Sequence, residues 1–274
     1  STASSRTAIS PLLTAITPNA VQPIVKRIAS PASNTPSVTI SHALRTATAT
    51  GNAELDLKLE IPINDVARSV VQGRVTLTGN DVRLSTATPL LAGAKARVDF
   101  SQQGFSVRAG SARVLGGAAS IDGGVQPDGS QRFTVQGIAS ADALRRASEL
   151  GPMSRLAVHM SGQTSYRLAL GIVRGHPEFT LTSPMTGLAI DLPAPLKKAA
   201  ELTWPLRAES RLANAAEGEP LRDTLSIELG NVIQAQYQRD LSHDDASVLR
   251  GSIAVLDSLP PRPERGVHAL LNLP

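Results

Sequence analysis

The chain has 274 residues and a formal net charge of +4, from 27 Lys and Arg against 23 Asp and Glu. That length suits one large domain or two ordinary ones, and 41% apolar residues beside 18% charged residues argue against a disordered chain. The absence of cysteine excludes a disulfide scaffold, a cysteine nucleophile and a thiolate metal site. With 3% aromatic residues and no run of Lys and Arg, the sequence argues against a nucleic-acid partner.

Residues 1–50 differ in composition from the rest of the chain. They are rich in Ser, Thr, Ala and Pro, and we expect a loosely ordered leader there. No stretch of about 18 apolar residues predicts a membrane-spanning helix, and no signal peptide is evident. The chain begins at Ser1 rather than Met, which fits a piece of a longer protein.

From Gly51 onward the apolar residues alternate with polar ones, which predicts half-buried β-strands. Turn signals at 79–81, 101–104 and 127–130 indicate antiparallel pairing of strands that follow one another in sequence. The predicted strands cover residues 55–63, 74–78, 82–85, 94–100, 105–109, 132–136, 156–161, 166–172, 179–181, 188–192, 206–208, 225–229, 233–237, 252–256 and 267–273.

Only one or two short helices are predicted. The first runs over residues 141–150, where Ser140 is a candidate N-cap and Gly151 and Pro152 are expected to end the helix. A second short helix is expected within residues 193–201, because two prolines precede a run of good helix formers.

Two short helices are too few to cover the apolar faces of so many strands, so something else must cover them. Three solutions remain open: the sheet closes into a barrel, pairs into a sandwich, or curls into a groove whose apolar lining meets a ligand. The alternation of residues does not choose among them.

No catalytic constellation is evident, and the sequence predicts neither a cofactor nor a metal site. The run His243-Asp244-Asp245 has ligand-type side chains, but a solvated turn is the preferred interpretation. Lys197 and Lys198 are candidates for contact with a lipid headgroup, although a solvated helix end explains them more simply.

Several segments resemble the AsmA-like superfamily, in its YhdP branch. The segment 181–200, with its Gly-Leu pair and its Leu-Pro-Ala-Pro-Leu-Lys-Lys run, is similar to the hallmark segment of that branch. Shorter segments at 73–84, 91–105, 112–117, 250–254 and 263–267 resemble other strands, turns and a late hairpin of the family, in the same order. The resemblance covers roughly residues 51–273, and Met185 stands where a Leu is usual.

The resemblance implies a C-terminal portion of a large periplasmic protein of a Gram-negative bacterium, anchored in the inner membrane when complete. The implied fold is mainly β: an extended, twisted antiparallel sheet curled into a groove over residues 51–274, with one or two short helices. The implied function is the transport of phospholipid between the inner and outer membranes, with envelope proteins as possible partners.

In that reading the acyl chains lie on the apolar side of the strands. The residues expected to line the groove are Leu57, Leu59, Ala96, Val98, Phe105, Val107, Val158, Leu168 and Ile190. Alternation alone does not separate groove lining from ordinary core, and Val98→Asp should block transport in the first case and unfold the segment in the second. The rival interpretation is a structural or assembly scaffold of the envelope that binds no lipid, and an enzyme has little support.

Overall fold

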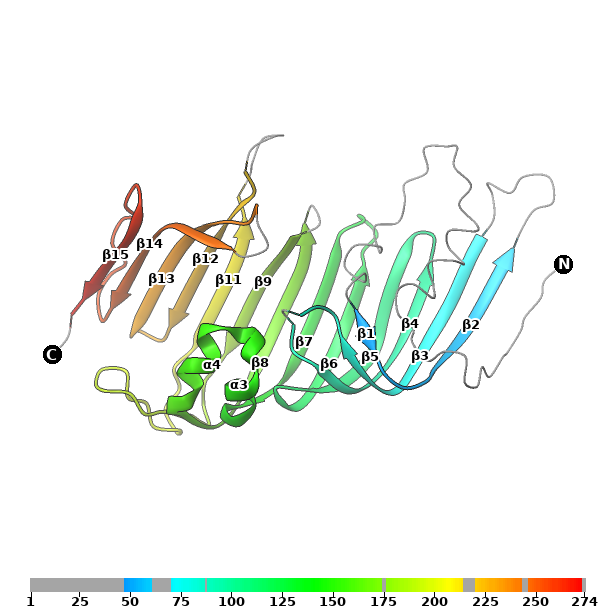
Figure 1. The fold of residues 1–274 in the computed structure, drawn as a ribbon, viewed down its shortest axis with the longest axis horizontal. Coiled ribbons are helices and arrows are strands. Elements are labelled where there is room, and N and C mark those ends of the chain that lie inside the picture. Colours follow the sequence, from blue (N-terminus) through cyan, green and yellow to red (C-terminus); the bar gives the residue numbers. More distant parts are fainter. Residues whose placement is uncertain are drawn as a thin grey trace.

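The computed structural model describes residues 47–272, apart from 61–69, 87, 174–175, 214–219 and 243–245. Most of the predicted leader and the run His243-Asp244-Asp245 therefore lie outside the described residues. The described chain forms one sheet of fifteen strands, with short helices at one side (Figure 1).

The strands have the following bounds: β1 Thr48–Ala49, β2 Ala53–Glu60, β3 Val70–Arg83, β4 Leu91–Ser101, β5 Gly104–Val114, β6 Gly116–Val125, β7 Gln131–Ser140, β8 Met160–Val173, β9 His176–Ser183, β10 Leu188–Ile190, β11 Leu206–Leu212, β12 Arg222–Leu229, β13 Ile233–Asp240, β14 Ser247–Val255 and β15 Gly266–Leu271. From β3 to β15 each strand pairs with its neighbour in sequence, except that β9 pairs with β11, while β10 pairs with β8. β1 and β2 both pair with β3.

The sheet is open, since β2 at one end and β15 at the other do not pair with each other. No second sheet lies over it among the described residues, so neither closed solution holds for that part of the chain. A mainly β fold with one open sheet and two short α-helices is thereby confirmed. The curl into a groove stays a prediction.

One strand pair departs from the expected antiparallel order. β14 and β15 are parallel, with Arg250 opposite Gly266, whereas the family resemblance suggested a hairpin here. The connection 256–265 contains Pro260, Pro261 and Pro263, which cannot donate to a ladder. The connection therefore returns without pairing, and β15 starts beside the early part of β14.

The helical segment is longer than predicted. α3 (Ala141–Arg146) begins as expected, with Ser140 Oγ accepting a hydrogen bond from the Ala143 amide. The predicted single helix over 141–150 is wrong, because α3 ends at Arg146 and a 3-10 helix covers Ser148–Leu150. Gly151 ends that turn as expected, but Pro152 opens a further helix, α4 (Pro152–Leu156). A proline needs no amide partner in a first turn, so it starts a helix as readily as it stops one.

Two other local predictions are wrong. The turn at residues 79–81 is absent, and β3 continues through it with shifts of register against β4. Asn80 holds that irregularity, since its amide nitrogen donates to the carbonyls of Thr50 and Asn52. The segment 193–201 contains no helix, because its Lys198 backbone pairs with Ile190 as an isolated bridge.

Candidate functional site: one apolar face of the sheet

Strand register places most of the large apolar residues of the sheet on one side. Val75 pairs with Val98, and Val98 pairs with Val107, so these three side chains share a face. We call the face that carries them and their register partners the apolar face, and the opposite one the polar face. Paired residues point to the same side of a sheet, so the pairing of each strand extends this assignment to the next.

One row of the apolar face crosses every strand of the sheet except β1 and β10. Its members are all aliphatic or glycine, and we call it the central row: Ala53, Leu77, Ala96, Gly110, Ile121, Val135, Leu168, Leu181, Ala208, Ile227, Ala235, Ile253 and Ala269. The register is continuous from Ile121 to Ala269, and a bulge in β5 separates Ile121 from Ala96. With strands about 4.8 Å apart, the row is roughly 58 Å long.

Side chains of the central row are half-buried in most strands. Leu77, Ile121, Leu168 and Ile227 all have intermediate exposure, as flanking side chains cover them and no second layer does. The core of a sandwich would bury them almost completely. The apolar face is thus accessible over much of its length.

Charge is nearly absent from the strands of this face. By register, Asp223 and Arg239 are its only charged residues within the described strands, and they bind each other. The Arg239 Nε lies 2.9 Å from Asp223 Oδ1, and Ser210 Oγ donates to Asp223 Oδ2 at 2.6 Å. Asp223 is 1% exposed, so this pair neutralises itself and leaves the face without an unpaired charge there.

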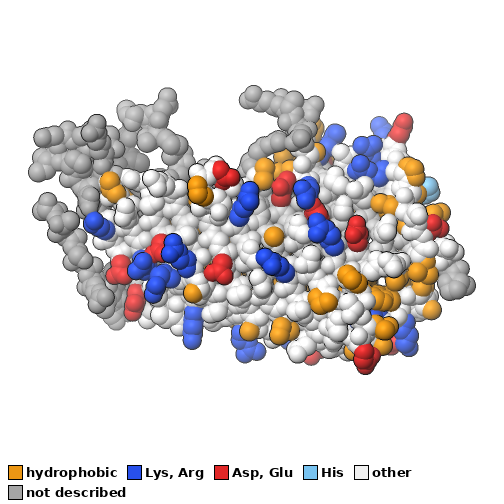
Figure 2. Space-filling view, turned by 180° about the vertical axis from the view of Figure 1, so that it is seen from behind, with side chains coloured by type: hydrophobic (Ala, Val, Ile, Leu, Met, Phe, Trp, Pro, Cys, Tyr) orange, Lys and Arg blue, Asp and Glu red, His pale blue; other side chains and the backbone are white. Residues whose placement is uncertain are grey.

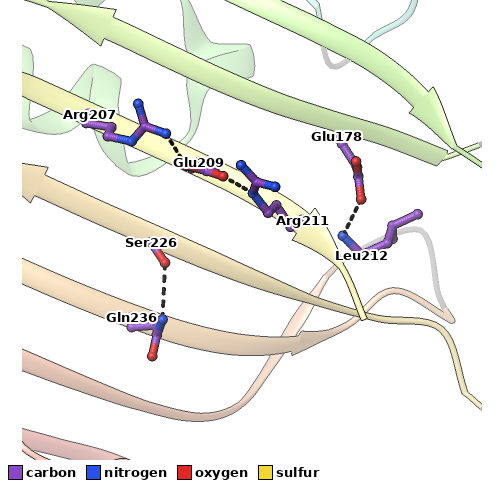
Figure 3. A network of polar contacts seen from close by, with 7 residues as sticks. All are labelled: Glu178, Arg207, Glu209, Arg211, Leu212, Ser226 and Gln236. Atoms are coloured by element: carbon purple, nitrogen blue, oxygen red, sulfur yellow. Dashed lines mark hydrogen bonds and ion pairs between the residues drawn. The ribbon is translucent and has the colours of Figure 1, made fainter. Parts of the chain in front are cut away.

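Figure 2 shows the side away from the helices, over which Lys, Arg, Asp and Glu side chains are spread. Charged residues of the polar face include Glu54, Asp56, Arg74, Arg97, Asp99, Arg132, Arg167, Glu178, Arg207, Glu209 and Arg211. They form ladders within and between strands: Arg74 binds Asp99 at 2.6 Å, and Arg207 binds Glu209 at 2.6 Å. In Figure 3, Glu209 lies between Arg207 and Arg211 on β11.

One long edge of the apolar face is covered. Neighbouring antiparallel strands alternate in direction, so the start of β8, the start of β11 and the end of β12 share this edge. There Met160, Leu206 and Leu229 pack with the helices and with the segment that follows β9. Farther along the same edge, the second buried cluster consists of Ala94, Ala112, Val114 and Ala119.

Lys198 holds the covered edge together. The side chain is 1% exposed, and its Nζ donates to the carbonyls of Met185 and Leu188 at 2.7 Å and of Ala199 at 3.1 Å. Burial lowers the pKa of Lys198, and the carboxylate of Glu201 opposes that shift. The interpretation of Lys198 as part of a solvated helix end is wrong, whereas Lys197 is exposed and lies near Asp191.

Most of the predicted lining residues lie on the apolar face. Ala96 and Leu168 belong to the central row, and Val98 and Val107 to the next row. Leu57 and Phe105 lie in the row beyond that one. Leu57 pairs with Gly73, and Phe105 pairs with Phe100, which is the other partner of Gly73. Leu59 pairs with Val71 in the register of β2 and β3.

Two predicted lining residues lie elsewhere. Val158 is in a 3-10 turn, Ala157–His159, and is 57% exposed, so the strand predicted at 156–161 begins only at Met160. The alternation of Leu156, Val158 and Met160 is an accident of a helical segment. Ile190 is 5% exposed and packs in the cluster under the helices, which makes it a core residue.

The residues that sequence reasoning missed are those that shape the face. Four aromatic side chains lie over glycines of neighbouring strands, at the pairs Phe100 and Gly73, Phe133 and Gly123, Tyr166 and Gly137, and Tyr237 and Gly251. The signal was present in the sequence, but only the register shows which glycine faces which ring.

The geometry defines a class of protein: an open β-sheet with one continuous apolar face and one charged face. The YhdP protein family model matches residues 33–274, and the chain belongs to this family. No curated protein and no solved structure matches the chain. Membership in the family is consistent with AsmA-like lipid transport and points to the periplasmic envelope.

Neither a membrane-spanning helix nor a metal centre is present in the described part of the chain. None of its helices has the length and hydropathy needed to cross a bilayer. No group of three or more His, Asp and Glu side chains is placed there to hold a metal ion.

Proposed function

We propose that this chain is a segment of a periplasmic protein that carries phospholipid between the inner and outer membranes. The acyl chains lie on the apolar face, and the headgroups stay in water. The longer protein is anchored in the inner membrane of a Gram-negative bacterium, and the segment itself performs no catalytic step. The observation that carries the proposal is the central row, which has no polar side chain from β2 to β15.

Apolar contact suits transport because it is non-directional and similar at every strand. Each methylene group removed from water contributes about 0.8 kcal/mol, so a bound acyl chain is held firmly in total. Moving the chain along the row exchanges one aliphatic contact for another of similar strength. No position along the row is a deep free-energy minimum for the acyl chain, since the row has neither a charge nor a hydrogen-bonding side chain.

The length of the row also fits this substrate class. The hydrocarbon core of a bilayer is about 30 Å thick and contains two acyl chains end to end. One chain therefore spans about 15 Å, so the roughly 58 Å row has room for several chains in sequence.

The test compares Leu168→Asp with Ala169→Asp. The two residues are adjacent on β8, but Leu168 lies between Val135 and Leu181 on the apolar face, and Ala169 lies between Thr134 and Thr180 on the polar face. Both changes add one negative charge. Only the first puts a carboxylate under an acyl chain, where its desolvation opposes binding.

The protein is purified from a Gram-negative host, and bound phospholipid is measured by native mass spectrometry and lipid extraction. We expect the parent and Ala169→Asp to carry phospholipid and Leu168→Asp to carry about tenfold less, with the same β-sheet circular dichroism in all three. Val98→Asp tests a second site, nearer β2. A folded, monodisperse parent without lipid would overturn the proposal in favour of an envelope scaffold, and equal loads in the two Asp variants would exclude the apolar face.

A further inference from the structure

Aromatic rings on the apolar face lie close to the sheet, because the residues beside them on the neighbouring strands are glycines. At Gly73 an added Cβ would come within 2.3 Å of Phe100 Cζ, and at Gly251 within 2.5 Å of Tyr237 Cδ1. Distances below 3.0 Å do not occur for real Cβ atoms, so either ring would have to move. Each ring thus occupies the volume where its partner's side chain would otherwise stand.

The same arrangement recurs at two further pairs. An added Cβ would come within 2.7 Å of Phe133 Cδ1 at Gly123 and within 3.0 Å of the Tyr166 hydroxyl at Gly137. At Gly123 the added atom would also meet the Arg132 carbonyl at 2.3 Å, so that glycine is required by the backbone as well. An added Cβ would also approach the Asp56 carbonyl at 2.9 Å at Gly73 and the Gln236 carbonyl at 3.0 Å at Gly251, but at both glycines the nearest atom belongs to the ring. Gly73 and Gly251 are therefore better probes of ring position than Gly123.

The rings border the central row without entering it. Phe133, Phe179 and Tyr237 stand in the adjacent row, on the side opposite the covered edge, and Phe100 and Phe105 stand one row farther out. The Phe105 and Phe133 ring centroids are 6.0 Å apart, so two of these rings contact each other across strands. The central row is thus a strip of small and aliphatic side chains between aromatic rings and the buried clusters.

We propose that acyl chains lie along the central row, across the strands, and that Gly73 and Gly251 keep the aromatic border low enough for them to pass. This inference rests on the proposed function and adds to it the direction in which the acyl chains lie and the residues that keep their path open. A Cβ at either glycine pushes the ring away from the sheet, with no change in charge or polarity. The displaced ring then stands beside the central row and hinders an acyl chain that lies there.

The experiment uses Gly73→Ala and Gly251→Ala, with Gly171→Ala as the matched control. Gly171 lies on the polar face, between Arg132 and Glu178, and an added Cβ there meets only the Gln131 carbonyl at 3.8 Å. The proteins are incubated with vesicles of palmitoyl-oleoyl phosphatidylethanolamine, and bound lipid is counted by native mass spectrometry. We expect about tenfold less lipid in each of the first two variants and the parental amount in Gly171→Ala.

A rescue variant separates ring position from simple loss of structure. In Gly73→Ala/Phe100→Leu the lifted ring is gone, and we expect the lipid load to return to within about twofold of the parent. Parental loads in both glycine variants, or a double variant as empty as Gly73→Ala, would overturn the inference while the proposed function stands. An empty parent protein would instead overturn the proposed function.

The path itself is tested on the parent protein, which covers the case in which both alanine variants fail to fold. A phosphatidylethanolamine with a diazirine near the end of one acyl chain is bound and photolysed, and the crosslinked peptides are sequenced. We expect crosslinks at central-row residues of several strands, such as Val135, Leu181 and Ile227. Crosslinks confined to successive apolar positions of single strands would overturn the inferred path.

Discussion

At the scale of single residues, Lys198 and Lys197 give a sharp contrast between neighbours. Lys198→Met leaves the carbonyls of Met185 and Leu188 without their buried donor, and we expect the free energy of unfolding to fall by about 3 kcal/mol. Lys197→Met removes only an exposed contact with Asp191 and should change stability by less than about 0.5 kcal/mol. Urea denaturation followed by circular dichroism measures both, and equal effects would contradict the role given to Lys198.

Tyr166 yields a prediction about pH. Its hydroxyl is buried and has no hydrogen-bond partner among the described residues, and burial raises its pKa. The unfolded chain therefore loses this proton first, above about pH 10, so the native state loses stability as pH rises from there toward the folded-state pKa.

Tyr166→Phe should therefore raise the free energy of unfolding at pH 7 by about 1 kcal/mol and lose less stability than the parent between pH 10 and 11. Denaturation curves at both pH values give the comparison. Burial also raises the pKa of Tyr237, which is still present in the variant. The variant should therefore still lose some stability between pH 10 and 11. Identical alkaline losses in parent and variant would show that the Tyr166 phenol does not contribute.

Sequence reasoning could not find these residues. A lysine in a Pro-rich segment is ordinarily solvated, and nothing in Pro195-Leu196-Lys197-Lys198 shows which of the two lysines turns inward. That choice depends on carbonyls supplied by Met185 and Leu188, more than nine residues away in the chain.

At the scale of elements, alternation predicted most strands well because one face of the sheet is wet and the other is not. The prediction from sequence failed where a short stretch of sequence is compatible with two local structures. Pro152 starts a helix instead of ending one, and Gly79-Asn80-Asp81 forms an irregularity within β3 instead of a turn. In the first place the chain breaks at Gly151, which has a positive φ of 56°, and Pro152 fits the first position of the next helix. In the second place a tertiary contact decides, because the Asn80 side chain donates to the Thr50 carbonyl.

β15 should be the least stable strand of the described sheet. All six of its residues are exposed, and it pairs on one side only, with β14. β8 has partners on both sides and lies under the helices. We expect the amides of β15 to exchange with deuterium at least about a hundredfold faster than those of β8, by local opening at the edge. Equal protection in hydrogen-exchange mass spectrometry would show that the sheet opens as one unit.

At the scale of the whole molecule, the alternation of apolar and polar residues predicted that the sheet has an apolar face. It did not predict what covers that face. Val98 and Leu168 would alternate in the same way in a sandwich, where a second sheet would bury them. The order of the strands decides the matter for the described residues, because an open sheet leaves the face uncovered beyond the helices. Strand order depends on contacts that no single segment of sequence encodes.

The central row also has a consequence for insertions and deletions. Side chains alternate between the two faces, so removing one residue inside a strand exchanges the faces for the rest of that strand. In β7, losing Thr134 would bring Arg132 toward the position that Phe133 now holds, and a charge would enter the apolar face beside the central row. Losing two residues would shorten β7 and shift its rows by one step, with every side chain still on its own face. Gene variants of such a protein should thus tolerate even-numbered changes in strand length better than odd-numbered ones.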